Sequence, residues 1–350
     1  MDLRPLLLRP DNFTPPTRTP WGGRKILDRF KRGVALDPGR AAYPVVGESW
    51  EISVEPDFPS LADDTGRRLD AVLAASPVEW LGREGVARHG PSTPLLVKLL
   101  DAADDLSVQV HPANDHAGLE ADESGKPEAW YVVDRDPGAG IYLGLQDGVG
   151  RESAARTLAS GGDLGEMLHF VPVEPGDFFA IGPGVVHAVG KGVTLVEPQL
   201  VLPGKRGVTY RVWDWNRRYD ASGRLDAAGE LRPLHSSKAH AVIAWDGPRG
   251  DDFIESARLS PELVESSGSA KRERWPSSPS VPIAVERVSG SGALALSTGD
   301  RLWGLTVLAG EVRVASSLTV GIGRSAVVPA ALGTVRLDLG GADAILASAI

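Results

Sequence analysis

The heptapeptide Leu106-Ser107-Val108-Gln109-Val110-His111-Pro112 is the stretch from which the fold and the chemistry of this chain are best inferred. Two valines alternate in it with two polar residues, and a period of two is typical of a β-strand. Gln109 and His111 should therefore project from one face while Val108 and Val110 pack on the other. A carboxamide oxygen and an imidazole nitrogen two residues apart can both reach one metal ion. The stretch alone is equally compatible with a strand that carries two polar residues on its wetter face.

Two later stretches place further ligand types on strand-like segments. Residues 125–133 contain Lys126 and Glu128, which share a face by the same rule, and residues 183–190 carry His187 in an apolar strand. Each residue also has an ordinary explanation, since Glu128 fits a surface carboxylate and a lone histidine in an apolar strand is often a hydrogen-bonded core residue. Together with Gln109 and His111 they offer two nitrogen and two oxygen ligands. Such a set suits a borderline divalent ion, zinc first, with iron, manganese, nickel or cobalt also compatible.

The composition limits the classes of function. The 350 residues carry a formal net charge of −9, which argues against a surface for nucleic acid, although a few local cations suffice for a small phosphorylated ligand. There is no cysteine, so disulfides and thiolate ligands are excluded. No apolar run reaches the roughly 20 residues of a membrane span, and the first residues lack the apolar core of a signal peptide. A cytoplasmic protein with no membrane partner is expected.

The chain reads as many short strands, because its 41 glycines and 27 prolines are spread throughout. Residues 94–100 form a strongly apolar run that predicts a buried strand. Helical periodicity is limited to about 67–89 and to a modest insert at 151–168. Residues 246–282 are rich in serine, proline, glycine and charge, which predicts a linker or long loops. Strand-like segments at 302–315 and 325–330 then suggest a second β-unit.

Several short segments resemble the signature segments of the type I mannose-6-phosphate isomerases. The resemblance covers about residues 18–240 in order and is fainter in the last third, where residues 305–311 are similar to the family's last cupin half. The segments are Gln109-Val-His111-Pro112, Gly125-Lys126-Pro127-Glu128, Gly184-Val-Val-His187-Ala188, Thr209-Tyr210-Arg211-Val212, Lys98-Leu-Leu-Asp101-Ala102, Trp21-Gly22-Gly23, Gly47-Glu48-Ser49-Trp50-Glu51 and Arg232-Pro-Leu-His235.

The resemblance implies a mainly β fold of the bicupin type, with two β-barrel or jelly-roll units and a few short helices. Residues 1–240 would form the catalytic cupin domain with small helical inserts, and residues 241–350 a C-terminal cupin-like β domain. The stretch between Glu128 and His187 is too short for the large helical domain of longer members. The chain is therefore similar to the compact bacterial branch.

The activity implied by the resemblance is the interconversion of mannose 6-phosphate and fructose 6-phosphate, by proton transfer through an enediol. One Zn²⁺ per chain would be held by Gln109, His111, Glu128 and His187. Arg211 and Lys126 match the family's catalytic residues, and the lysine could transfer a proton if the metal and burial lower its pKa. Substrate binding would fall to Glu48, Glu197, Lys205 and Arg206, of which the last two are cations suited to a phosphate.

One departure from the family pattern leaves alternatives open. Gly207 stands four positions before Arg211, where the family carries an acidic residue, so Lys126 or Glu48 would have to act as the base. An isomerase of a different phosphosugar and a non-catalytic sugar-binding cupin therefore both remain alternatives. An iron-dependent cupin oxygenase is disfavoured, because its ligand set is rich in histidine and Gln109 does not fit it. The sequence is compatible with a monomer or a dimer.

Overall fold

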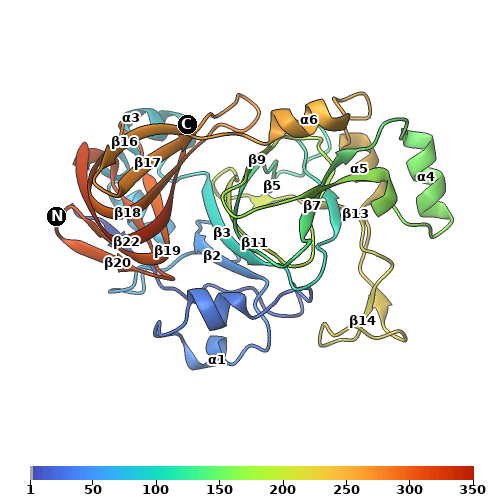
Figure 1. Ribbon diagram of the computed structural model, residues 1–350, viewed down its shortest axis with the longest axis horizontal. Helices are drawn as coiled ribbons and strands as arrows, with labels where there is room; N and C mark the ends of the chain where they lie inside the picture. Colours follow the sequence, from blue (N-terminus) through green and yellow to red (C-terminus); the bar gives the residue numbers. More distant parts are fainter. Residues whose placement is uncertain (1–2) are drawn as a thin grey trace.

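The computed structural model describes residues 3–350, and β-strands make up most of the regular structure. The strands gather into two bodies that lie side by side, with the C-terminal strands in one and most of the preceding strands in the other (Figure 1). The predicted mainly β fold with a few short helices is confirmed. The sheets are open layers of the jelly-roll kind, and they do not close into complete barrels in the described part of the chain.

The larger body consists of two five-stranded sheets that contribute facing layers of one β-sandwich. The strands of the first sheet are, in spatial order, β13 (Tyr210–Trp213), β4 (Val108–Val110), β10 (His187–Val189), β7 (Gly140–Leu145) and β8 (Leu168–Pro172). Those of the second are β2 (Glu48–Ile52), β3 (Leu95–Asp101), β11 (Val193–Leu200), β6 (Glu128–Arg135) and β9 (Phe178–Ile181). Two short ribbons complete it, β5 (Glu123–Ser124) with β12 (Arg206–Gly207) and β14 (Arg218–Tyr219) with β15 (Glu230–Leu231).

The second body is a single bent sheet that starts with a strand from the N-terminal end of the chain. A Cβ on Gly310 (φ +61) would lie 2.2 Å from the carbonyl oxygen of Gly341, so only glycine allows two long neighbouring strands to approach at their bend. The strands are β1 (Leu6–Leu7), β21 (Ser325–Val328), β19 (Trp303–Val314), β22 (Thr334–Ala349), β18 (Ile283–Ser297), β17 (Ala270–Trp275) and β16 (Glu262–Ser267), with β20 (Leu318–Gly321) paired to β19.

The helices are short and lie at the periphery of the sheets (Figure 1). None of them within residues 3–350 has the length and apolarity to cross a membrane. They are η1 (Ile26–Phe30), α1 (Pro38–Ala41), α2 (Leu69–Ala75), α3 (Pro77–His89), α4 (Arg151–Ala159), η2 (Gly165–Met167), α5 (Ser236–Val242), α6 (Gly250–Ala257) and η3 (Ala330–Leu332). Helices at 69–89 and 151–159 agree with the sequence periodicity.

The prediction of a linker at 246–282 is wrong, because this segment forms α6, β16 and β17. β17 pairs with both β16 and β18, and its Ala270 and Trp275 are buried while charged side chains between them stay accessible. β16 is an edge strand with mostly exposed residues. A strand that faces solvent on most of its surface needs little apolar content, so its composition resembles that of a loop.

The alternation in β4 works as the heptapeptide predicts. Val108 and Val110 pack outward against Ala154 of α4 and Ala239 of α5, within one buried apolar cluster. His111, just after the strand, and its neighbour Gln109 face the opposite sheet in the interior of the sandwich. Burial of the valines under two helices thus sets the orientation of the polar pair.

A buried ion pair connects the two bodies. Lys31 Nζ lies 2.5 Å from Glu51 Oε1, and both side chains are almost completely buried. Glu51 also accepts hydrogen bonds from Ser49 (2.6 Å) on its own strand and from Ser325 (2.7 Å) on β21. Glu48 and Trp50, on the same strand, instead line a cavity of the larger body. The contact therefore holds one strand of that body against the C-terminal sheet.

The division of the chain at residue 240 stays a prediction. The C-terminal sheet is built mainly from residues after 240, but β1 pairs with β21 and so residues 6–7 belong to it. One apolar cluster also runs from Leu8 to Ala347 across both bodies.

Candidate metal centre and active site

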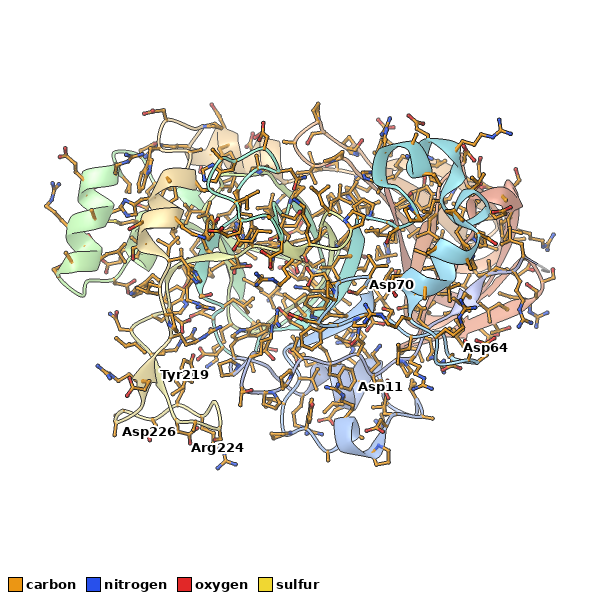
Figure 2. All side chains as sticks on the ribbon, turned by 180° about the vertical axis from the view of Figure 1, so that it is seen from behind. Asp11, Asp64, Asp70, Tyr219, Arg224 and Asp226 are labelled. Carbon is orange, nitrogen blue, oxygen red and sulfur yellow. The ribbon has the colours of Figure 1, made fainter. Side chains whose placement is uncertain are left out.

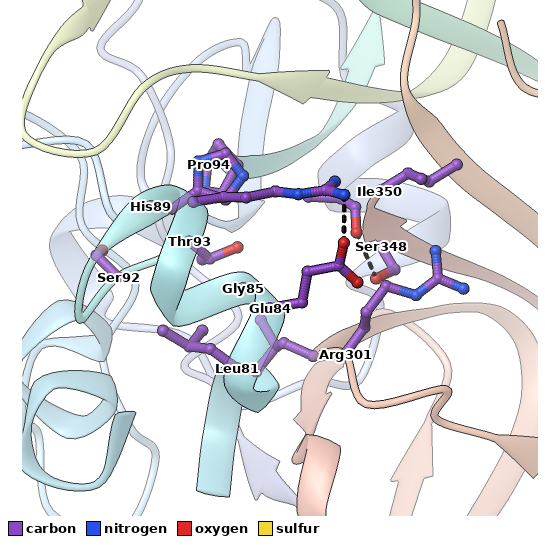
Figure 3. A pocket seen from close by; sticks show the side chains of 13 residues that line it. Leu81, Glu84, Gly85, His89, Ser92, Thr93, Pro94, Arg301, Ser348 and Ile350 are labelled. Atoms are coloured by element: carbon purple, nitrogen blue, oxygen red, sulfur yellow. Dashed lines mark hydrogen bonds and ion pairs between the residues drawn. The ribbon is translucent and has the colours of Figure 1, made fainter. Parts of the chain in front are cut away.

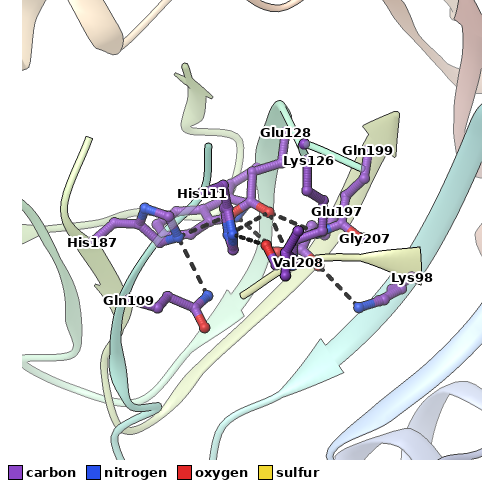
Figure 4. Close-up of polar contacts among 12 residues, drawn as sticks. Lys98, Gln109, His111, Lys126, Glu128, His187, Glu197, Gln199, Gly207 and Val208 are labelled. Atoms are coloured by element: carbon purple, nitrogen blue, oxygen red, sulfur yellow. Dashed lines mark hydrogen bonds and ion pairs between the residues drawn. The ribbon is translucent and has the colours of Figure 1, made fainter. Parts of the chain in front are cut away.

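Three buried side chains converge inside the larger body from three different strands. The ligand atoms of His111, Glu128 and His187 all lie within 4.8 Å of one another. Glu128 Oε1 is 3.2 Å from His187 Nε2, and Glu128 Oε2 is 3.4 Å from His111 Nε2 (Figure 4). All three side chains are at most 2% exposed. His187 begins β10, which pairs with β4 just before His111, and Glu128 begins β6 in the other sheet, so these residues, far apart in the sequence, meet between the two sheets.

The hydrogen bonds of the two histidines determine which nitrogen is free. His111 Nδ1 donates to the carbonyl oxygen of Val208 (2.8 Å), and His187 Nδ1 donates to that of Val185 (2.9 Å). Both Nε2 atoms therefore carry lone pairs that face the carboxylate. Burial, together with the charge of nearby Lys126, lowers the pKa of His111 to about 3, which keeps its imidazole neutral.

Three acceptors thus face one point with no proton to share, and this arrangement is suited to a cation. His111 Nε2 and Glu128 Oε1 are buried atoms without a hydrogen-bond partner among residues 3–350. Gln199 donates to Glu128 Oε2 (2.7 Å) and so orients the carboxylate. The donor set of two imidazoles and a carboxylate fits a divalent metal ion of the zinc type.

Gln109 completes the set expected from the heptapeptide. Its Nε2 lies 3.3 Å from His187 Nε2, on the side of the cluster opposite Gln199 (Figure 4). The two ends of a carboxamide are interchangeable by rotation, and the rotated amide would direct an oxygen to the same place. The structure therefore brings all four predicted ligands together, and their role as ligands stays a prediction.

A cavity of about 170 Å³ opens next to these residues and holds an unusual concentration of charge. Its walls contain both carboxylates and cations, of which Glu55, Lys98, Lys126 and Glu197 are buried. The charged residues that line it are Arg18, Glu48, Glu55, Lys98, Lys126, Glu197, Arg211 and Arg232, together with Gln109.

Burial does not leave Lys126 with a lowered pKa, and the lowering by a bound metal that the sequence analysis expects stays a prediction. Burial lowers the pKa of its ammonium, but the carboxylates of Glu128, Glu197 and Glu48 outweigh burial and raise it above the ordinary value. Its Nζ lies 3.5 Å from Glu128 Oε2. Without a metal charge the lysine is thus a stable cation. The sequence could not reveal this, because the opposing carboxylates come from other strands.

Glu197 shows the opposite behaviour. Its carboxyl group is buried, and burial, with the charge of Glu128, raises its pKa to about 8 although Lys98 and Lys126 oppose the change. Trp130 Nε1 donates to Glu197 Oε1 (3.0 Å), and Lys98 Nζ lies 3.9 Å from Oε2. A carboxylate with such a pKa is a much stronger base than an ordinary glutamate.

Gly207 stands where the sequence analysis notes a missing acidic residue, and a carboxylate from another segment lies beside it. Glu55 Oε1 accepts a hydrogen bond from the backbone N–H of Gly207 (2.9 Å), and Glu55 lines the cavity. A Cβ on Gly207 would lie 2.8 Å from Val201 and 3.1 Å from the Lys126 side chain. The glycine therefore leaves room for these neighbours, and the cavity still contains an acid at this point.

The remaining predicted residues separate into two groups. Glu48, Glu197 and Arg211 line the cavity, whereas Lys205 and Arg206 are not among its lining residues. Arg206 instead forms a surface ion pair with Asp122 (2.8 Å). The substrate-binding role of these two cations stays a prediction without a contact to support it.

Sequence reasoning did not assign roles to other lining residues. Lys98 and Arg232 lie in segments that carry the family resemblance and could have been singled out. Arg18 and Glu55 lie in loops with no local pattern that points to a site.

A second cavity lies between α3 and the C-terminal end of β22, and it shares no lining residue with the charged cavity (Figure 3). It measures about 40 Å³, enough for only a few water molecules. Glu84 on its wall is already paired with Arg88. It is therefore a weaker candidate for a ligand site.

Comparison with known proteins agrees with the geometry. Residues 18–137 match the family described as phosphomannose isomerase type I, catalytic domain. A mannose-6-phosphate isomerase of Streptococcus mutans is 31% identical over 306 residues, which cover 86% of this chain and 84% of the relative. The chain belongs to the type I phosphomannose isomerases. This membership confirms the resemblance found in the sequence.

Solved structures of phosphomannose isomerases have the same fold over their whole length. The mannose 6-phosphate isomerase of Bacillus subtilis superposes with a TM-score of 0.78 at 25% identity, covering 98% of this chain and 99% of that one. A putative mannosephosphate isomerase of Archaeoglobus fulgidus gives 0.73 at 21% identity and covers both chains completely. The second likeness concerns the fold alone. Phosphomannose isomerases are isomerases, so the family supports an enzymatic role for the cavity.

Proposed function

We propose that the protein is a zinc-dependent isomerase that interconverts mannose 6-phosphate and fructose 6-phosphate through an enediol. The observation that carries the proposal is the buried cluster of His111, Glu128 and His187, joined through Gln109 to a cavity that Gln109 lines together with acid–base side chains. Two imidazoles and a carboxylate favour Zn²⁺. When bound, such an ion would polarise the sugar's carbonyl oxygen and make the neighbouring C–H more acidic.

The isomerisation moves one proton between C1 and C2, so the cavity must contain a group that accepts the proton and returns it. We assign this role to Glu197. Its carboxylate lines the cavity, and its pKa of about 8 makes it a base of suitable strength near neutral pH. Its hydrogen bond from Trp130 keeps the carboxylate in place during the transfer.

Lys126 and Arg211 would stabilise negative charge on the sugar oxygens. The carboxylates of Glu128, Glu197 and Glu48 favour the ammonium form of Lys126, so we assign it to donate hydrogen bonds to an enediolate rather than to accept a proton. Arg211 lies opposite Gln109 on the neighbouring strand, and its planar guanidinium offers a fixed cation to the same region. Both residues thus act on charge that develops during the reaction.

The test is an isomerase assay of the purified protein with a panel of aldose 6-phosphates in D₂O. We expect turnover to be fastest with mannose 6-phosphate, and the fructose 6-phosphate formed should carry deuterium at C1 from exchange at the enediol stage. Faster turnover of another aldose phosphate would change the substrate. Binding of phosphosugars without turnover of any would favour the non-catalytic sugar-binding cupin.

A further inference from the structure

One buried carboxylate of the charged cavity has no cation paired with it. Glu48 and Glu197 lie 3.7 Å and 3.9 Å from the Nζ of Lys98. Glu55 lines the same cavity and is 7% exposed, but it forms no ion pair within residues 3–350. In that part of the chain its carboxylate accepts one hydrogen bond, from the backbone N–H of Gly207 (2.9 Å). Its other oxygen is therefore available to a donor on a ligand.

The loop that follows β2 holds Glu55 in a defined position. The backbone N–H of Ser60 donates to the carbonyl oxygen of Ser53 (2.8 Å), and that of Ser53 donates to Ser60 Oγ (2.9 Å). The backbone N–H of Glu55 donates to Ser53 Oγ (3.1 Å). Pro56 follows directly and biases the backbone of Glu55 towards an extended conformation. The residue is thus ordered before a ligand binds, which lowers the entropic cost of a contact to it.

The segment that contacts Glu55 also contacts the metal cluster. Gly207 donates to Glu55, and its neighbour Val208 accepts a hydrogen bond from His111 Nδ1 (2.8 Å) through its carbonyl oxygen (Figure 4). A Cβ on Gly207 would lie 3.1 Å from Cδ of Lys126, whose ammonium is 3.5 Å from a cluster carboxylate. Glu55 therefore borders the cavity on the side formed by Lys126 and the metal cluster.

We propose that Glu55 binds a hydroxyl group of the sugar, and that it supplies from the loop after β2 an acidic contact that Gly207 cannot make. Every sugar hydroxyl is a hydrogen-bond donor, and an ionised carboxylate is a strong acceptor for it. A Cβ on Gly207 would lie 3.3 Å from Glu55 Oε1, so an acidic side chain at 207 would reach the same place. The identity of the sugar phosphate that carries the hydroxyl rests on the proposed function.

The first test compares Glu55→Gln with the wild type. The amide oxygen of glutamine can still accept the hydrogen bond from Gly207, so its NH₂ group, which only donates, would face the sugar hydroxyl. The probe is mannitol 1-phosphate, the reduced form of mannose 6-phosphate, which lacks the carbonyl and binds without turnover. Loss of a charge-assisted hydrogen bond should weaken its calorimetric affinity by about 10- to 100-fold. The KM for mannose 6-phosphate should rise by a similar factor.

Controls separate a hydroxyl contact from other effects of the substitution. Inorganic phosphate has no sugar hydroxyl, so its affinity should not fall in Glu55→Gln. Asp64→Asn is the matched control, because Asp64 is an exposed carboxylate at the periphery of the molecule (Figure 2), 3.5 Å from Arg4, and it should keep the wild-type affinity for both probes. The zinc content of Glu55→Gln should equal that of the wild type, since Gly207 keeps its acceptor. Loss of zinc along with affinity would indicate a structural role and overturn the inference.

Exchange of the acid between positions 55 and 207 is the stricter test. Val201→Ala serves as the background, because a Cβ on residue 207 would lie 2.8 Å from Val201 Cγ2. In this background Glu55→Ala should weaken binding of mannitol 1-phosphate by about tenfold or more, and addition of Gly207→Asp should restore most of the loss. A structural role of Glu55 predicts no such recovery. A folded exchange variant that recovers no affinity would therefore contradict the inference.

The outcomes separate this inference from the proposed function. If the wild type binds mannitol 1-phosphate through Glu55 but isomerises no sugar, the hydroxyl contact stands and the isomerase assignment fails. If the enzyme isomerises mannose 6-phosphate and Glu55→Gln keeps the wild-type KM and affinity, the inference is overturned while the function stands. Absence of mannitol 1-phosphate binding to the wild type would also overturn it. Should the exchange variants not fold, the comparison of Glu55→Gln with the wild type decides alone.

Discussion

Replacing Glu197 with glutamine tests the proposed proton transfer most directly. Glutamine keeps the size of the side chain, and its Oε1 can still accept the hydrogen bond from Trp130 Nε1 (3.0 Å), so the fold should be retained. An amide cannot take up the substrate proton. A positioned general base contributes about 10²- to 10⁴-fold to the rate, so kcat should fall by that factor. This fall corresponds to a rise of about 3–5 kcal/mol in the activation free energy, at ~1.36 kcal/mol per tenfold.

The pH dependence has a definite sign. Burial raises the pKa of Glu197 from 4.5 to about 8, and the base must be ionised to act. Wild-type kcat/KM should therefore rise about tenfold per pH unit up to the pKa of this carboxyl and then level off. The level is reached near pH 8 without a metal charge and at a lower pH where a cation bound to Glu128 favours the carboxylate. The folded state favours the neutral carboxyl, so the stability that this group contributes is complete below pH 4.5 and is lost as the pH rises through about 8. Glu197→Gln should then unfold at a higher temperature than the wild type at alkaline pH, with little difference in acid.

The assay is steady-state isomerisation at a series of pH values from about 6 to 9.5, a range that brackets the pKa of the base. Glu55→Gln is the matched control, because it removes a carboxylate from the same cavity without removing the proposed base. This control should keep the ascending limb of the profile whatever its effect on the rate. If Glu197→Gln keeps more than about a tenth of the wild-type kcat, or keeps the ascending limb, Glu197 is not the base.

Further changes test the metal, the lysine and the contact between the two bodies. Removal of metal by a chelator, or His187→Ala, should abolish activity and bound zinc with little change in far-UV circular dichroism, and metal-free protein that isomerises at full rate would refute the metal assignment. Lys126→Met should lower kcat by about 10²-fold or more, since it removes a cation near the reacting oxygens, and an unchanged kcat would contradict that role. Lys31→Met leaves Glu51 buried without its cation (2.5 Å in the native pair). This substitution should lower the free energy of unfolding, measured in urea, by about 3–5 kcal/mol. The double variant Lys31→Met/Glu51→Leu should recover most of that loss, because it leaves no buried charge. Equal stability of all three proteins would argue against the ion pair.

The sequence by itself determined the strand character, the ligand types and the family. Alternation in residues 106–112 predicted which side chains face together, because the period of a strand is a local property of the backbone. The apolar run at 94–100 became the buried strand β3 for the same reason. The ligand types at Gln109, His111, Glu128 and His187 could also be read locally, since metal preference depends on the donor atoms themselves.

Only the tertiary structure decided how the site behaves. The pKa values of Lys126 and Glu197 are both raised, because charged groups from separate strands meet in one desolvated cavity. The electrostatic interaction energies behind these shifts depend on distance and burial rather than on sequence position. The carboxylate of Glu55 beside Gly207 and the place of Arg232 in the cavity wall have the same origin, since both residues come from segments that reach the cavity only after folding. The strands at 262–275 were missed because an exposed sheet edge needs little of the apolar pattern on which strand prediction relies.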